Sequence, residues 1–168
     1  VISGFHPLIT TISFDGSAMS TGDTPTLTIV FSEAVAALAN ADVTCDTGSL
    51  ATMTTSDDIT WAGTFTPTVN TDDATNTCAV ATSYTDAYGN GVGEAQSTAN
   101  YVVETLAPTI SSITNSDTAL ITGQTSTLTI VFNEAVAAFD KDDVTCPAGT
   151  LGTLSSGDSI TWTGTFTP

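Results

Sequence analysis

Basic side chains are almost absent from this sequence of 168 residues. Lys141 is the only Lys or Arg and His6 the only His, against eighteen Asp and Glu, so the formal net charge at pH 7 is −17. Binding to a nucleic acid needs several Lys or Arg side chains to neutralise phosphates, and electrostatic binding to anionic lipid needs a basic cluster. The composition therefore excludes nucleic acids as partners and electrostatic docking on anionic membranes.

Long apolar runs are also missing. No stretch approaches the roughly 20 consecutive apolar residues that a membrane-spanning helix needs, so no membrane insertion is predicted. Hydrophobic residues still make up 40% of the chain and the mean hydropathy is +0.22, which is enough to form a core. The usual exposed helix formers, Lys, Arg, Glu and Gln, are scarce, whereas Thr, Val and Ile favour strands. The sequence therefore predicts an all-β fold.

One part of the sequence repeats another. Residues 7–67 align without a gap on residues 108–168, at an offset of 101 residues and with 34 identities in 61 positions. A period of about 100 residues is too long for a solenoid repeat and is typical of one β-sandwich module. The sequence therefore predicts two tandem copies of one module.

Alternation of apolar and polar residues marks the strands within a module. In residues 26–31, Leu, Ile and Phe alternate with Thr and Val, and in the later stretch 59–66 the side chains of Ile59, Trp61 and Phe65 share one face. Turns rich in Gly, Asp or Asn separate such stretches. About seven antiparallel strands are expected per complete module, at residues 9–13, 26–31, 42–45, 50–54, 59–66, 78–82 and 99–103.

The repeat divides the chain into four parts. Residues 1–6 correspond to the end of a preceding repeat plus a linker, 7–103 form module 1, 104–107 form a linker, and 108–168 form module 2. Module 2 is predicted to be incomplete, because counterparts of residues 68–103, expected to hold its last two strands, do not occur in the sequence. Two interpretations stay open: the sequence is a window from a longer array, or a neighbouring subunit supplies the missing strands by β-augmentation.

Several short motifs resemble those of bacterial immunoglobulin-like (Big-type) tandem repeat domains of large surface proteins and adhesins. The motifs are Phe-Ser-Glu-Ala-Val at 31–35, Asp-Val-Thr at 42–44, Phe-Thr-Pro at 65–67 and Tyr-Thr-Asp-Ala-Tyr-Gly-Asn at 84–90. The first two return in the second copy, at 132–136 with Asn in place of Ser, and at 143–145. The resemblance implies tandem immunoglobulin-like β-sandwiches in extracellular arrays that act as stalks or spacers, some of them stiffened by Ca²⁺. The sequence departs from the pattern by carrying cysteines, which many such repeats lack.

Three cysteines occur, Cys45, Cys78 and Cys146. Cys45 and Cys146 are equivalent under the repeat, and the partner of Cys146 would fall outside the chain. A Cys45–Cys78 disulfide is therefore predicted, and it accounts for the odd count. Such a bridge indicates an oxidising, extracellular compartment. The alternative from the sequence is that the thiols are buried and unpaired.

Carboxylate and amide side chains fall at strand ends that a sandwich of this type can gather at one end of a module. Oxygen ligands of this kind hold Ca²⁺. Tentative calcium ligands are predicted within module 1 and at the junction between the modules: Glu33, Asp42, Asp86, Asn90, Glu104, Glu134 and Asp143. The alternative is that 86–90 is a hairpin turn and the other acids are a charged coat that keeps the chain soluble.

Catalysis finds no support in the sequence. It contains no Gly-x-Ser-x-Gly nucleophile motif and no phosphate-binding Gly-rich loop, and His6 falls where the repeat places a linker. We therefore predict a non-enzymatic structural segment, a stalk, spacer or filament building block of an extracellular, cell-surface or secreted filament protein, whose partners are neighbouring repeats or subunits. Two alternatives are a self-assembling filament subunit completed by strand donation from a neighbour, and a module that binds a glycan or cell-surface ligand.

Overall fold

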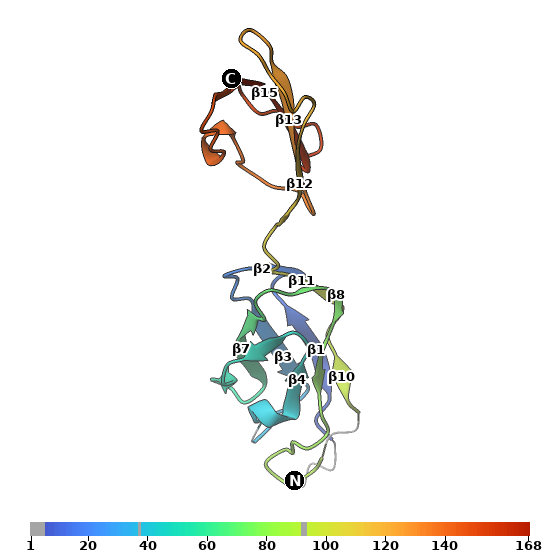
Figure 1. Cartoon of the computed structure of the whole chain (residues 1–168). Helices are drawn as coiled ribbons and strands as arrows, with labels where there is room; N and C mark the ends of the chain where they lie inside the picture. Colours follow the sequence, from blue (N-terminus) through green and yellow to red (C-terminus); the bar gives the residue numbers. More distant parts are fainter. Residues whose placement is uncertain (1–5, 37, 92–93) are drawn as a thin grey trace. The chain divides into compact units, whose positions relative to one another are not determined.

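The computed structural model describes residues 6–36, 38–91 and 94–168. Within these ranges the chain forms strands and two short 3₁₀ turns, and no helix there is long and apolar enough to cross a membrane. The predicted all-β class is therefore confirmed. The chain divides into two compact units, residues 1–106 and 107–168, each with its own core (Figure 1). The predicted end of a preceding repeat lies outside the described residues, except for His6.

The first layer of unit 1 is one antiparallel sheet. Its strand order is β1-β3-β7-β5, and the short strand β6 also pairs with β7. The bounds are Ile9–Phe14 for β1, Thr26–Phe31 for β3, Gly48–Leu50 for β5, Thr54–Thr55 for β6 and Thr60–Pro67 for β7. Each of these strands lies at or within two residues of a predicted one, and the predicted strand at 50–54 is divided between β5 and β6.

The second layer of unit 1 consists of two three-stranded sheets, ordered β10-β9-β4 and β2-β11-β8, in which β2 runs parallel to β11. The 3₁₀ turn η1, Asn40–Asp42, leads into β4. The bounds are Ala18–Ser20 for β2, Val43–Cys45 for β4, Asp72–Asn76 for β8, Cys78–Val80 for β9, Gln96–Ser97 for β10 and Tyr101–Glu104 for β11.

The described residues of unit 1 therefore form eleven strands, where the sequence predicts about seven. The break between β8 and β9 shows the physical reason. The side chain of Asn100 accepts a hydrogen bond from the Asn76 N–H at 2.9 Å, and that of Asp46 accepts one from the Thr77 N–H at 2.9 Å. Side chains thus take backbone donors that a neighbouring strand would otherwise use, and the ladder is interrupted.

Side chains from both layers meet in one core. The Leu, Ile and Phe of β3 are buried and its Thr and Val are half-buried, as the alternation predicts. Phe14 of β1 and Phe65 of β7 place their ring centroids 5.1 and 5.6 Å from that of Tyr101 in β11. Ile59 departs from the prediction, because it is 36% exposed. It lies in a turn before β7, where the Asp57 carboxylate accepts its N–H at 2.9 Å.

Unit 2 is one antiparallel sheet of four strands, β12-β13-β15-β14. The bounds are Ile110–Asn115 for β12, Ser126–Phe132 for β13, Thr150–Leu151 for β14 and Thr161–Thr167 for β15, and the 3₁₀ turn η2 spans Lys141–Asp143. The order and register repeat those of unit 1: Leu27 lies opposite Gly63, and Leu128 lies opposite Gly164. Phe139 packs against Phe132 and Trp162, with centroid distances of 5.0 and 5.6 Å.

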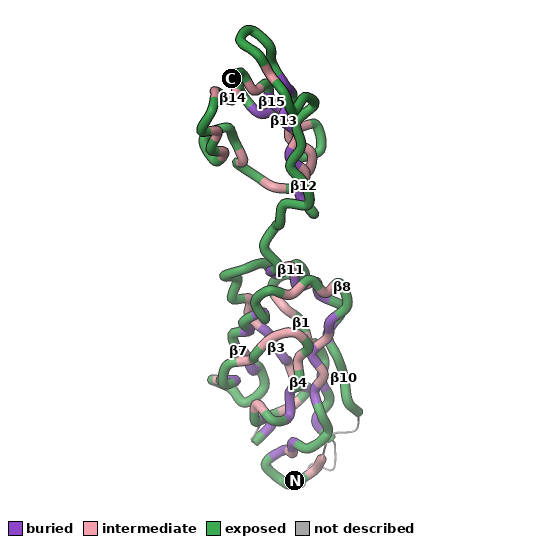
Figure 2. The backbone as a smooth tube through the Cα atoms, in the orientation of Figure 1, coloured by how far each residue is buried: buried purple, intermediate pink, exposed green. Residues whose placement is uncertain are grey.

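The face that is the core in unit 1 is partly open in unit 2, where fewer residues are buried (Figure 2). Ile9 is 5% exposed, whereas its equivalent Ile110 is 50% exposed. The cause is that residues 68–104, which cover this face in unit 1, have no counterpart among the described residues of unit 2. The sequence predicts two strands in this segment, whereas its described residues form four, β8 to β11.

Candidate functional site

The cysteines of unit 1 form the predicted disulfide. Cys45 and Cys78 lie opposite each other on β4 and β9, with a Cα–Cα distance of 4.0 Å. The N–H of Cys78 donates to the Thr98 hydroxyl and its carbonyl accepts from the Thr98 N–H, so the two cysteines form a pair without mutual backbone hydrogen bonds. The side chains of such pairs lie close together. The bridge therefore joins two strands within the second layer, while Cys146 of unit 2 is free and half-buried.

Asp42, a predicted calcium ligand, holds a turn in place. It is 9% exposed and is the last residue of η1. One carboxylate oxygen accepts the Ala39 N–H at 2.8 Å, and the other accepts the Ser83 hydroxyl. Its carbonyl also accepts the Ala81 N–H at 2.7 Å. Asp42 thereby connects the start of β4 to the segment that follows β9.

Asp86, another predicted ligand, organises the turn at 86–90. It is 3% exposed, and its Oδ1 accepts the N–H groups of Tyr88 and Asn90, both at 2.8 Å. Its Oδ2 accepts the Asn90 side-chain amide at 2.7 Å. Burial by itself would raise the pKa of Asp86, but these hydrogen bonds outweigh it and the pKa is lowered. The predicted alternative, a hairpin turn at 86–90, describes this arrangement.

Tyr84 lies two residues before Asp86 in the chain and is 2% exposed. Its ring packs edge-on against Phe31 at 5.0 Å. Among the described residues its hydroxyl has no hydrogen-bond partner. Burial, together with the nearby charge of Asp42, raises the pKa of Tyr84 to about 12. The phenol is therefore neutral at physiological pH and serves the core.

The remaining predicted ligands belong to different elements. Glu33 is half-buried after β3, whereas Glu104 ends β11, and its carboxylate accepts the Leu106 N–H at 2.9 Å. Glu134 is half-buried in unit 2, where it follows β13. Asp143 repeats the role of Asp42, because its Oδ2 accepts the N–H of the residue that precedes η2 at 3.0 Å.

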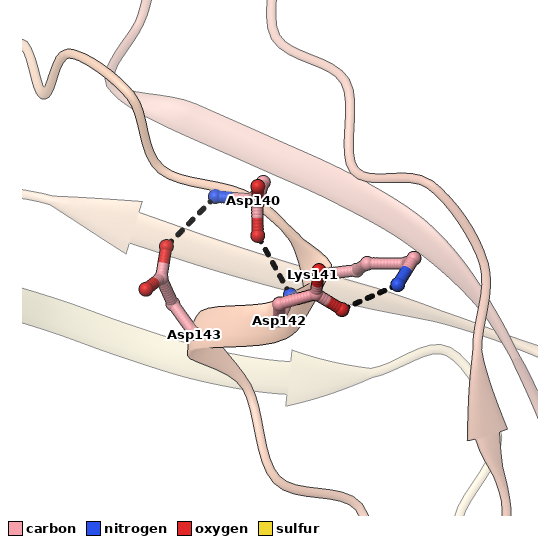
Figure 3. A network of polar contacts seen from close by, with 4 residues as sticks. All are labelled: Asp140, Lys141, Asp142 and Asp143. Atoms are coloured by element: carbon pink, nitrogen blue, oxygen red, sulfur yellow. Dashed lines mark hydrogen bonds and ion pairs between the residues drawn. The ribbon is translucent and has the colours of Figure 1, made fainter.

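The loop around η2 is a small polar network, shown in Figure 3. Asp143 accepts the Asp140 N–H, and the Asp140 carboxylate accepts the Asp142 N–H at 2.7 Å. Lys141 forms an ion pair with Asp142 on the exposed side of the turn. The first two contacts both cap the start of the turn. The acidic residues here thus supply acceptors for their own backbone.

The hydrogen bonds of these carboxylates can be compared with what a calcium site requires. Among the described residues, no group of three or more His, Cys, Asp or Glu side chains is placed to hold a metal ion. A calcium ion needs six to eight oxygen ligands, and the carboxylates of Asp42 and Asp86 already accept hydrogen bonds on both oxygens. The protein's own donors therefore already contact both oxygens of these two carboxylates. Binding of Ca²⁺ by the chain stays a prediction.

The segment between the units is fixed to each of them by a threonine. Thr105 is 7% exposed, its N–H donates to Thr71 O at 2.7 Å and its hydroxyl to Thr68 O at 2.6 Å. On the other side, the Thr109 N–H donates to the Asn133 side chain at 2.6 Å, and the Asn133 N–H donates back to Thr109 O at 2.9 Å. Residues 106–108 alone lie between these two fixed points.

Sequence reasoning missed the role of Thr105. It assigned residues 104–107 to a linker, whereas Glu104 belongs to β11 and Thr105 is packed into unit 1. A single buried Thr in a sequence this rich in Thr carries no local signal. The Asn133–Thr109 contact occurs in both units, because the corresponding pair in unit 1, Ser32 and Leu8, forms the same exchange of hydrogen bonds.

The geometry defines a class: a tandem of immunoglobulin-like β modules, closed into a two-layer sandwich in unit 1. The chain belongs to the bacterial Ig-like domain family. The model of this family matches residues 6–103 and 104–168. The resemblance drawn from the short motifs is thereby confirmed. The chain is also similar to the solved structure of FdeC, an Escherichia coli adhesin, at 12% identity and a TM-score of 0.48, over 95% of this chain and 56% of that chain. A comparison with curated proteins finds no match.

Proposed function

We propose that the chain is a structural repeat segment of an adhesin-like bacterial surface protein, in which each module is a spacer and no reaction is catalysed. Membership of the bacterial Ig-like domain family supports this assignment. The Cys45–Cys78 disulfide supports an oxidising, extracellular location. A net charge of −17 favours mutual repulsion of neighbouring molecules and so keeps extended chains separate.

One observation carries the spacer role: only residues 106–108 separate the anchored Thr105 from the anchored Thr109. Pro108 fixes its own φ and restricts the residue before it to extended conformations. The Leu106 N–H is in addition held by the Glu104 carboxylate. Few backbone dihedrals remain free, so a length of chain built in this way transmits a set distance from one module to the next.

Spin labels on the purified chain test the spacer role. Thr52 and Thr153 are equivalent under the repeat and both are exposed, so Thr52→Cys and Thr153→Cys are labelled in a Cys146→Ser chain that keeps its disulfide. Electron–electron dipolar spectroscopy should give one narrow distance distribution. A control chain with four Gly-Ser residues inserted after Leu106 should give a broad one, because such linkers behave as random coils. Equally broad distributions in both chains would contradict the spacer role.

The same labelled chain also tests whether the chain binds Ca²⁺. If Ca²⁺ bridges acidic residues near the linker, added Ca²⁺ should narrow the distance distribution further and raise the melting midpoint by several degrees, since a ligand of the folded state stabilises it by mass action. EDTA should reverse both changes, and Mg²⁺ at the same concentration serves as the control. A midpoint and a distribution that stay unchanged with Ca²⁺ and with EDTA would remove calcium from the account.

A further inference from the structure

One strand pair of unit 1 joins the beginning of the unit directly to its end. Strand β2 pairs with β11, the last strand of the unit, and this pairing is parallel. All other strand pairs formed by the described residues are antiparallel. Strand β1 comes earlier in the chain, but it lies at the edge of the first layer and is paired with β3 alone. The β2–β11 pair is therefore the shortest connection between the two ends of unit 1.

The direction of this pair decides how it responds to tension. Tension on the chain pulls β2 toward its amino end and β11 toward its carboxyl end. In a parallel pair these two ends lie at opposite ends of the ladder, so the strands are sheared and the hydrogen bonds must break together. An antiparallel hairpin that is pulled from its two free ends opens one bond after another, which needs less force. The β2–β11 pair is thus oriented to resist separation of the ends of unit 1.

Buried side chains add to this resistance. Met19 of β2 lies opposite Val103 of β11, and these side chains are 2% and 0% exposed. The Val102 N–H also donates to Ser17 O at 2.9 Å, which extends the contact beyond the start of β2. Sliding one strand along the other would therefore withdraw two side chains from the core and expose apolar surface to water.

Thr105 fixes the carboxyl end of the pair. Its carbonyl accepts the Thr21 hydroxyl at 3.4 Å, which continues the contact between the two strands. Its hydroxyl donates to Thr68 O at 2.6 Å and accepts the Thr71 N–H at 3.0 Å. Tension that arrives from the segment between the units is thereby passed at Thr105 both to the end of β2 and to the turn between β7 and β8.

The Cys45–Cys78 disulfide limits how far unit 1 can extend after the pair has separated. Strands β5 to β8 all lie between the two cysteines. A covalent bond withstands forces that break hydrogen bonds, so tension crosses from Cys45 to Cys78 through the bridge. Residues 46–77 then remain a closed loop, and only the residues outside the loop add to the length of the extended chain.

We propose that unit 1 is a tension-bearing element, in which the parallel β2–β11 pair sets the unfolding force and the Cys45–Cys78 bridge sets the maximum extension. The inference rests on the proposed spacer role, because a spacer between two attached bodies carries any force that separates them. The force that unfolds unit 1 does not depend on the stiffness of residues 106–108. Failure of the spacer role and failure of this inference are therefore distinguishable.

Single-molecule force spectroscopy of the full chain tests the limit on extension. A Cys146→Ser chain is held by handles at its two termini and pulled at constant speed. The unfolding step of unit 1 is recognised because its length depends on the bridge. The paired change Cys45→Ser and Cys78→Ser should lengthen this step by about 110 Å, since it releases 33 more residues at roughly 3.5 Å each. A step of the same length with and without the bridge would contradict the closed loop.

Two proline variants locate the resistance. Val102→Pro removes the N–H that bonds to Ser17 O within the β2–β11 contact, and Tyr101 before it already lies in a strand. Ala81→Pro is the matched control, because it removes the bond from the Ala81 N–H to Asp42 O at 2.7 Å, outside this contact. Val102→Pro should lower the unfolding force of unit 1 by at least about a third, and Ala81→Pro should lower it much less.

A milder pair of variants keeps the test valid if a proline prevents folding. Val103 on β11 and Val80 on β9 are both fully buried, so each change to Ala should cause a similar loss of stability in urea. Forced unfolding follows the unfolding rate, which depends on the contacts that break first. At one force, Val103→Ala should raise that rate at least about tenfold and Val80→Ala less than about threefold. Equal effects of the two valine changes, or an unfolding force that Val102→Pro leaves unchanged, would overturn the proposal.

Discussion

Replacing Phe65 with Ala should lower the free energy of unfolding of unit 1 by about 3–5 kcal/mol, the usual cost of removing a large buried aromatic side chain. Phe65 is fully buried, and its ring centroid lies 5.2 Å from that of Phe14 and 5.6 Å from that of Tyr101. The measurement is urea unfolding followed by Trp61 fluorescence, in a chain in which Trp162→Phe leaves one tryptophan to report on unit 1.

Unit 2 supplies the matched control. Phe166 occupies the equivalent position on β15 but is half-buried, because no second layer covers it. Phe166→Ala, followed by Trp162 fluorescence in a Trp61→Phe chain, should therefore cost less than half as much as the change in unit 1. The reason is that a partly hydrated ring gains less from burial and leaves no closed cavity. Equal losses at the two positions would contradict the assignment of a closed core to unit 1 and an open face to unit 2.

Loss of the Cys45–Cys78 bridge should lower the free energy of unfolding of unit 1 by about 3–4 kcal/mol in the chain-entropy description, because the bridge closes a loop between cysteines 33 residues apart. The paired substitution Cys45→Ser and Cys78→Ser removes it without leaving a reactive thiol in unit 1. Urea unfolding of the Trp162→Phe chain measures the loss, and the change in the denaturant slope shows whether the unfolded state also expands.

Cys146→Ser is the control for this experiment. Cys146 is free and closes no loop, so its replacement should change the stability of unit 1 by less than about 0.5 kcal/mol. Reducing agent should then destabilise the Cys146→Ser chain and leave the chain without Cys45 and Cys78 unchanged. A paired variant as stable as the original would mean that the bridge constrains little in the unfolded chain.

Much of the fold could be predicted from the sequence because the chain repeats itself. The alternation in residues 26–31 recurs without change at 127–132, and strands β3 and β13 occupy these stretches with identical register to their neighbours. The disulfide could be predicted for the same reason, since the repeat identifies Cys146 as the cysteine without a partner. Regular alternation and exact repetition are both visible in sequence order, without knowledge of contacts.

The short strands of the second layer could not be predicted in the same way. Strand β8 begins at Asp72, within a stretch whose Asn and Asp residues favour a turn, and it forms because β11 pairs with it. Gly48 shows a second limit: an added Cβ would lie 2.0 Å from the ring of Phe65, a close approach that only the folded structure reveals. Contacts between residues far apart in the sequence determine both the strand β8 and the need for glycine at position 48.

How the carboxylates of the candidate calcium ligands are oriented could not be predicted from the sequence for a related reason. The pattern of Asp and Glu at strand ends is the same whether an acid binds a metal or accepts hydrogen bonds from its own turn. Asp42 and Asp143 both accept the N–H three residues earlier in the chain, which is a local role. Sequence order predicts where such acids fall, whereas the direction of each carboxylate depends on the backbone around it.

Hydrogen exchange measured on the intact chain tests the central claim most directly, which is that one module sequence is closed by residues 68–104 in unit 1 and left open in unit 2. Mass spectrometry of matched peptides from residues 26–31 and 127–132 compares two strands that are identical at all six positions and have equivalent hydrogen-bonded neighbours. Opening free energies follow the burial of the surrounding core. We expect the amides of β3 to exchange at least about tenfold more slowly than those of β13, and equal protection of the two strands would contradict the account.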